Sequence, residues 1–303
     1  MDSTKTEYAN RQIRRVTYLG ITGNIVLAIV KAVVGLTAGS MALVADSIHS
    51  LSDLVTDIAL LLGVHFGSKE PDPEHPYGHG RIETFSGAFI AVALIIVGGV
   101  LIQRASVAIA RLHSSQSSIG DVGWAVAWVA LLSIAVKEGL YWITRKVAVK
   151  TNSSALYANA WHHRSDALSS IAVLIGFISI KLGYDHGDRV ATIVVGLLII
   201  LVGVKIFLGC LEEFAERAVD STTVEQIKEI IASENRIRQW HKLRTRNVGR
   251  EIFIDLHVLV DPQLDITAAH EIATALEEAM HARLTRPTNI MVHVEPDRPE
   301  LRK

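Results

Sequence analysis

Two long apolar stretches of the chain carry the same pair of ionisable residues. His49 and Asp53 are four residues apart in the first stretch, and His162 and Asp166 are four apart in the second. If both stretches are helical, each pair lies on one face, because positions i and i+4 are neighbours on a helix. Two imidazoles and two carboxylates form a nitrogen and oxygen ligand set that suits a divalent metal ion. We predict that this helical quartet is a metal site.

Other polar residues flank the quartet at helical spacing. Asp46 and Asn159 lie one turn earlier on the same faces, and we expect them to orient ligands or line a path. Asp57, one turn after Asp53, either lines the inner half of that path or faces water. His163 is expected to point elsewhere. A polar network that merely holds two helices together is the alternative, but such networks usually use Ser, Thr or Asn.

Six apolar stretches are long enough to cross a bilayer, whose hydrocarbon core is about 30 Å thick. Ionisable groups within such stretches are costly in lipid, so they indicate function. Lys and Arg are more frequent in the connections on one side, which predicts cytoplasmic N- and C-termini. Lys31, Lys137 and Lys205 fall within spans, where we expect snorkelling or pairing, for Lys137 with Glu138 or a neighbouring helix. The expected spans are 16–37, 41–66, 82–110, 122–147, 154–182 and 189–215.

Composition excludes several classes of protein. The chain has 303 residues, of which 50% are hydrophobic, and a net charge of −1, which gives no reason to expect nucleic-acid binding. Cys210 is the single cysteine, so neither a disulfide framework nor a thiolate metal site is available within one chain. We expect an α-helical membrane domain over 1–218 and a cytoplasmic metal-binding and dimerisation domain over 219–303.

The last part of the chain has the pattern of a small α+β domain. Apolar residues alternate strictly from Ile252 to Val260 and again from Ile290 to Val294, as in half-buried strands. Trp240 to Val248 is expected to form a further strand, and Ile266 to Leu284 an amphipathic helix. With a helix starting near Ser221, the predicted order is αββαβ, a ferredoxin-like arrangement.

Two further groups of residues have side chains of the types that bind metal ions. Asp72, His75 and His79, the loop group, lie between the second and third spans among prolines that stiffen the backbone. A solvated loop is the alternative. The tail group lies on the polar faces of the predicted strands, where exposed histidines are common even without a metal. Its members are His241, His257, His293 and Glu295.

Together these features resemble the cation diffusion facilitator family of metal–proton antiporters, which includes bacterial zinc and ferrous-iron efflux proteins. The resemblance covers nearly the whole chain. It rests on the six spans, the paired His-x-x-x-Asp motifs, the Asp-x-x-His-x-x-x-His-Gly loop, Leu243–Arg246 and His293-x-Glu295.

The resemblance implies roles for these groups. The helical quartet corresponds to the family's transport site, the loop group to an interfacial site and the tail group to a dinuclear site. His270 matches a tail position that joins the dinuclear site in some members. Members are dimers joined through the tail, with a basic–acidic interlock that Arg81 and Glu216 match. Histidine in both paired motifs resembles zinc-type rather than manganese-type members, whereas Glu295 replaces an Asp of close homologues.

We therefore expect a homodimeric, multi-pass protein of a bacterial inner or other cell membrane. It would export Zn²⁺, or Fe²⁺, Co²⁺ or Cd²⁺, from the cytoplasm in exchange for protons, and need no cofactor besides transported and regulatory ions. A membrane-anchored metal sensor or assembly scaffold is the alternative. An enzyme is not expected, because no His-Glu-x-x-His motif with its general base occurs.

Overall fold

The computed structural model describes residues 3–37, 47, 50, 53–110, 124–181 and 187–302. The chain divides into two compact units. One, the helical unit, comprises Arg11–Leu211, and the other comprises Met1–Asn10 with Glu212–Lys303.

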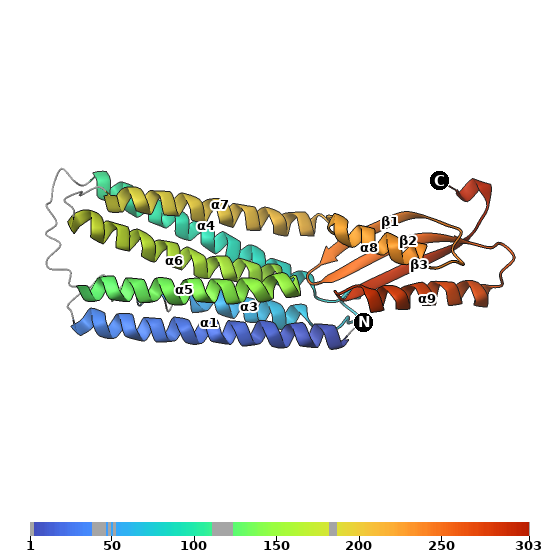
Figure 1. The fold of residues 1–303 in the computed structure, drawn as a ribbon, viewed down its shortest axis with the longest axis horizontal. Coiled ribbons are helices and arrows are strands. Elements are labelled where there is room, and N and C mark those ends of the chain that lie inside the picture. The colour runs from blue at the N-terminus through green and yellow to red at the C-terminus, as the bar shows by residue number, and fades with distance from the viewer. Residues whose placement is uncertain are drawn as a thin grey trace. The chain divides into compact units, whose positions relative to one another are not determined.

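The helical unit contains long helices that run along one another (Figure 1). Within the described residues, four segments are long and apolar enough to span a membrane: Glu7–Val34, Arg81–Val107, Ala127–Thr151 and Ile193–Phe214. The 14 described residues of α3 are apolar but too short to span, and the earlier part of that predicted span lies outside the described residues. The chain is thus a multi-pass membrane protein, and the count of six spans stays a prediction. The helices are α1 (Ser3–Thr37), α3 (Leu54–Gly67), α4 (Arg81–Ala110), α5 (Trp124–Thr151), α6 (Ser154–Lys181) and α7 (Gly187–Phe214).

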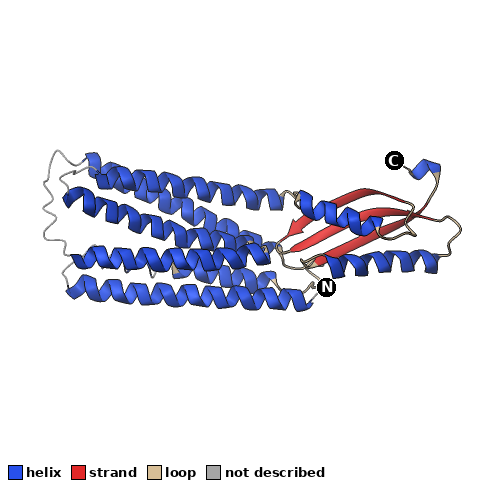
Figure 2. Ribbon diagram, in the orientation of Figure 1, coloured by secondary structure: helices blue, strands red, loops and turns tan. Residues whose placement is uncertain are grey.

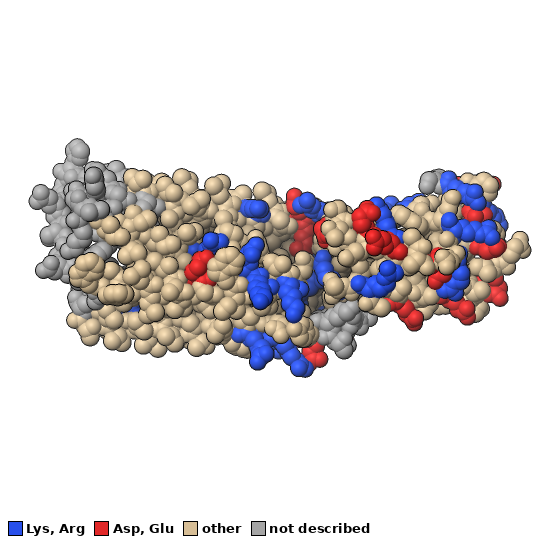
Figure 3. Space-filling model, viewed as in Figure 1, with Lys and Arg blue, Asp and Glu red and all other residues tan. Residues whose placement is uncertain are grey.

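The surface of the helical unit is that of a lipid-facing bundle. Large apolar side chains such as Ile29 and Leu201 are exposed, at 58% and 66%. On the face drawn in Figure 3, charged side chains are sparse over the helices and lie toward one end of them. Small residues allow close packing inside: a Cβ added to Gly98 on α4 would lie 2.7 Å from the carbonyl oxygen of Gly196 on α7.

Residues after the bundle form a three-stranded sheet with helices (Figure 2). The strands lie in the order β1-β2-β3, with β1 antiparallel and β3 parallel to β2. The predicted αββαβ order is observed, and each predicted strand agrees with the structure to within two residues. The elements are α8 (Ser221–Ala232), β1 (Gln239–Val248), β2 (Glu251–Val260), α9 (Ile266–Arg283), β3 (Thr288–Pro296) and the short 3-10 helix η2 (Pro299–Leu301).

Helices α8 and α9 pack on the same face of the sheet. Ile227 of α8 and Leu276 of α9 share a core with Ile254 and Leu256 of β2. Asp220 caps α8, accepting hydrogen bonds from the backbone N–H and the hydroxyl of Thr223. These bonds lower the pKa of Asp220 below its usual value of 3.8. Because the helices occupy one face, polar side chains of alternate strand positions are left on the other.

Candidate metal-binding site in the helical unit

Three members of the predicted quartet lie together in the helical unit. Asp53 is the residue before α3, and His162 and Asp166 lie one turn apart on α6. Nε2 of His162 is 3.5 Å from Asp53 Oδ1 and 4.0 Å from Asp166 Oδ2, and all three side chains are buried. Each residue offers one ligand atom, and these atoms lie within 4.8 Å of one another. His49, the fourth predicted ligand, lies outside the described residues, as does Asp46.

A lysine that was not predicted as a site residue lies between the two carboxylates. Nζ of Lys137 on α5 is 2.9 Å from Asp53 Oδ2 and 2.7 Å from Asp166 Oδ2. Lys137 is 1% exposed, so it does not snorkel. The suggested partner Glu138 instead lies 3.7 Å from Arg164. The other suggestion, pairing with a neighbouring helix, is correct, and the partners are the predicted metal ligands.

One helical turn after Asp53, the carboxylate of Asp57 is hydrogen-bonded by two amide side chains. Asn24 Nδ2 of α1 donates to Asp57 Oδ2 at 2.9 Å, and Asn159 Nδ2 of α6 donates to Asp57 Oδ1 at 3.0 Å. Asp57 is fully buried, so it does not face water. His163 was expected to point elsewhere, but its Nε2 lies 3.5 Å from Asn159 Nδ2 and the residue is 1% exposed. We call these four residues the amide–carboxylate cluster.

The loop group is brought together by a tight turn around Asp72. Its carboxylate accepts the backbone N–H of His75 at 2.7 Å, and Nδ1 of His75 lies 3.1 Å away. Nε2 of His79 lies 3.4 Å from the other carboxylate oxygen. Desolvation would raise the pKa of Asp72, but the backbone N–H and ring of His75 bring it below its usual value. The geometry fits a three-ligand cation site.

The tail group lies on the face of the sheet that the helices leave open. Nδ1 of His257 is 2.7 Å from Glu295 Oε1, and Nε2 of His241 is 3.0 Å from Glu295 Oε2. His293, which pairs with His257 in the strand register, has Nε2 3.5 Å from Glu295 Oε1. The hydrogen bond from His257 holds the pKa of Glu295 below its usual value. His241, His257 and Glu295 place ligand atoms close enough to share one ion.

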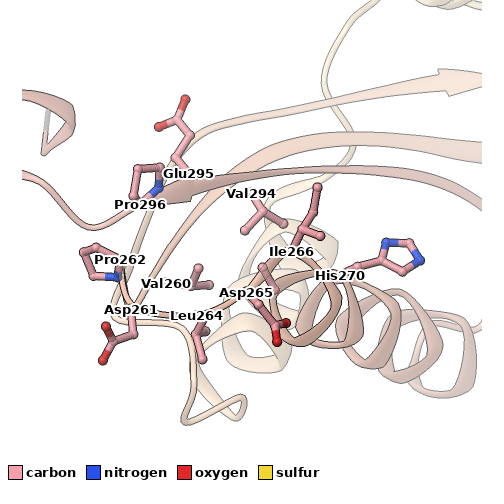
Figure 4. Close-up of a pocket in the computed structure, with 11 residues that line it drawn as sticks. Val260, Asp261, Pro262, Leu264, Asp265, Ile266, His270, Val294, Glu295 and Pro296 are labelled. Carbon is pink, nitrogen blue, oxygen red and sulfur yellow. The ribbon is translucent and has the colours of Figure 1, made fainter.

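His270 is not part of this convergence. It lies on α9 and lines a shallow pocket with Val260, Ile266 and Glu295. In Figure 4 its imidazole and the Glu295 carboxylate point in different directions. Glu216, implied to interlock with Arg81, accepts a hydrogen bond from Arg246 at 2.9 Å. The interlock and the role of His270 stay predictions.

Comparison with known families matches both parts of the chain. The cation efflux transmembrane domain matches residues 17–214, and the cytoplasmic domain of cation efflux proteins matches residues 219–297. The chain belongs to the cation efflux, or cation diffusion facilitator, family. The expected resemblance is therefore confirmed.

The chain is similar over most of its length to several relatives. An uncharacterized transporter of Methanocaldococcus jannaschii, MJ0449, is 34% identical, covering 94% of this chain and 99% of the relative. The manganese efflux system protein MneP of Bacillus subtilis is 28% identical, covering 93% and 96%. Metal tolerance protein C1 of Arabidopsis thaliana is 33% identical over 92% of this chain, and the chain spans 61% of that relative's length.

Proposed function

We propose that the protein is a proton-coupled antiporter that exports divalent metal cations from the cytoplasm. This proposal rests on one observation: the side chains of Asp53, His162 and Asp166 are buried and lie close together within a multi-pass helical unit. Carboxylates are costly in such surroundings unless cations compensate them, and the Lys137 ammonium brings only one positive charge to the two carboxylates. A sensor or scaffold would not need this arrangement inside its membrane helices.

The ligand types support Zn²⁺ as the first candidate ion. With His49 added, the site would offer two imidazoles and two carboxylates, which is a four-ligand set that zinc accepts. Fe²⁺, Co²⁺ and Cd²⁺ accept similar ligands, and one relative's name specifies manganese efflux. Mn²⁺ therefore belongs in any test of selectivity.

Proton exchange follows from the chemistry of the same ligands. Imidazole and carboxylate must be deprotonated to bind a metal, so cation binding releases protons and proton binding releases the cation. His162 supplies an imidazole, the kind of side chain that binds either a proton or a metal ion. This coupling needs no residue outside the site.

The rest of the proposal concerns assembly. We propose six spans with both termini in the cytoplasm and a homodimer joined through the sheet-containing unit, which has a ferredoxin-like fold. The family model that matches residues 219–297 is described as the cytoplasmic domain of cation efflux proteins, which supports this placement. The loop group and tail group would then bind regulatory ions, while the helical quartet binds the transported one.

Flux measurements on reconstituted protein test the function. Proteoliposomes would be offered Zn²⁺, Fe²⁺, Co²⁺, Cd²⁺ and Mn²⁺, each with and without a pH gradient. We expect flux that depends on the gradient and is lost in Asp166→Asn. Glu138→Gln is the matched control, because it removes a carboxylate of α5 that pairs with Arg164 outside the site. No flux of any of these ions by the unaltered protein would favour the sensor or scaffold instead.

A further inference from the structure

The amide–carboxylate cluster is a second buried acidic position in the helical unit, distinct from the one that holds Lys137. Asp57 lies one helical turn beyond Asp53 on α3, and its carboxylate contacts amides from α1 and α6. Asp57, Asn24 and Asn159 are each 0% exposed. Apart from these two amides, no hydrogen-bond partner of the Asp57 carboxylate is found among the described residues. Both hydrogen bonds come from neutral amides, and neither amide brings a positive charge to the carboxylate of Asp57.

Several polar atoms of this cluster are buried without a hydrogen-bond partner among the described residues. They are Oδ1 of Asn24, Oδ1 of Asn159 and Nδ1 of His163. A buried polar atom without a partner costs about 1–3 kcal/mol, so three of them in one cluster call for an explanation. A network that only joined three helices would not need to leave its acceptors unused.

A cation at Asp57 would use these acceptors. A carboxamide turned by half a rotation exchanges its nitrogen and oxygen. Turning Asn24 and Asn159 would put carbonyl oxygens where the nitrogens now lie, 2.9 and 3.0 Å from the carboxylate oxygens. Neighbouring oxygen ligands of a small octahedral divalent cation lie about 3 Å apart, since each bond is about 2.1 Å long. The amide positions are therefore compatible with the ligand spacing of such a coordination shell.

His163 and Gly20 complete the arrangement. A Cβ added to Gly20 on α1 would lie 3.1 Å from His163 Nε2 and 3.9 Å from Asp57 Oδ1. Glycine at this position lets the imidazole of His163 lie close to the part of α1 that also approaches Asp57. The ring then adds one nitrogen donor to a set otherwise made of oxygen.

We propose that Asp57, Asn24, Asn159 and His163 form a second cation station, occupied in alternation with the Asp53–Asp166 site. The inference rests on the proposed transport function. One carboxylate, two carbonyl oxygens and one imidazole favour a divalent cation that prefers oxygen ligands, such as Mn²⁺, over Zn²⁺. With the proposed orientation, α3 runs inward, so Asp57 would be the station nearer the cytoplasm.

Mn²⁺ binding to the purified full-length protein tests the inference. Equilibrium dialysis would count Mn²⁺ per protomer in Asp166→Asn, Asp57→Asn and the double variant, with folding checked by circular dichroism and size-exclusion chromatography. We expect each single variant to retain the cation that the helical unit binds, because one station remains. The double variant should bind one Mn²⁺ fewer per protomer.

A second pair of variants keeps Asp57 in place. In the Asp166→Asn protein, Asn24→Leu should weaken Mn²⁺ binding at least tenfold, whereas Asn10→Leu, which removes another amide of α1 with a buried Oδ1, should not. If Asp166→Asn alone loses the cation, there is no second station, and the transport site stands. If the double variant also retains the cation, both the station and the proposed transport site are wrong.

Discussion

Replacing Lys137 by methionine should make the transport site bind its cation more tightly while making the metal-free protein less stable. In the structure the Lys137 ammonium is paired with both carboxylates, at 2.9 and 2.7 Å. A divalent cation must take these carboxylates from the ammonium before it can use them as ligands. Methionine has a similar length and no charge, so it removes this competition with little change in volume.

The size of the effect follows from the burial of the pair. Removing one partner of a buried ion pair costs about 3–5 kcal/mol, and Asp53 and Asp166 are 3% and 8% exposed. This cost is the upper bound for the destabilisation of the variant without a bound metal ion. The two carboxylates can share a proton in place of the ammonium, which offsets part of the cost. We therefore expect binding about tenfold to a hundredfold tighter, since about 1.4 kcal/mol corresponds to a factor of ten.

The assay combines calorimetric titration of purified protein with thermal unfolding, each with and without Zn²⁺. Without Zn²⁺ the variant should unfold at a lower temperature than the unaltered protein. Adding Zn²⁺ should raise its unfolding temperature by more, because a tighter ligand stabilises the folded state more. Lys137→Arg should behave like the unaltered protein in titration, since its charge remains.

Lys31→Met is the matched control for loss of a buried lysine. Lys31 is 3% exposed, and its Nζ donates to Ser50 Oγ at 3.0 Å. This variant should lose stability without tighter Zn²⁺ binding. If Lys137→Met binds Zn²⁺ no more tightly than the unaltered protein, Lys137 is a structural partner only and the competition argument is wrong.

Three further predictions concern proton coupling, the tail group and the α8 cap. Apparent Zn²⁺ affinity should fall as pH drops through the imidazole range, and His49→Asp should weaken that dependence; an unchanged pH profile would exclude His49 as a ligand. The fragment 219–303 should bind Zn²⁺ and melt at a higher temperature with it, a response that replacing His257 and His293 together should remove; no saturable binding in calorimetry would leave them as surface histidines. Asp220→Ala should destabilise the fragment by about 1 kcal/mol at neutral pH. The lowered pKa of Asp220 means that this difference persists above pH 3.8 and disappears as pH falls through the folded-state value; an unchanged difference in acid would contradict the cap.

Periodicity in the sequence was sufficient to predict the elements of the second unit. The alternation from Ile252 to Val260 predicted which residues enter the core, because successive side chains of a strand point to opposite faces. It also placed His257 and Glu295 on the opposite face, where the structure brings them to 2.7 Å. Phe253 and Leu259 depart from the pattern, since both are buried on the polar side of the alternation.

Contacts between helices were harder to predict. The i, i+4 rule brought His162 and Asp166 to one face of α6, and the structure agrees. The same rule applies to Asn159 and His163, but His163 was not expected to join the polar interior. Lys137 was missed as a site residue because local spacing on α5 says nothing about which carboxylates on α3 and α6 its four-carbon side chain reaches.

Charge balance links the two buried positions. In the deprotonated form that binds a metal, Asp53, Asp166 and Asp57 carry three negative charges, the imidazoles are neutral and Lys137 carries one positive charge, which gives this group a net charge of −2. One divalent cation neutralises it, whichever station holds the ion. Two cations at once would leave a net charge of +2 in a region of low dielectric, where uncompensated charge is costly. A monovalent cation would leave −1. The charges of these four residues therefore favour one divalent ion at a time. The ion would pass between Asp57 and the Asp53–Asp166 pair as the Lys137 ammonium moves away from the two carboxylates.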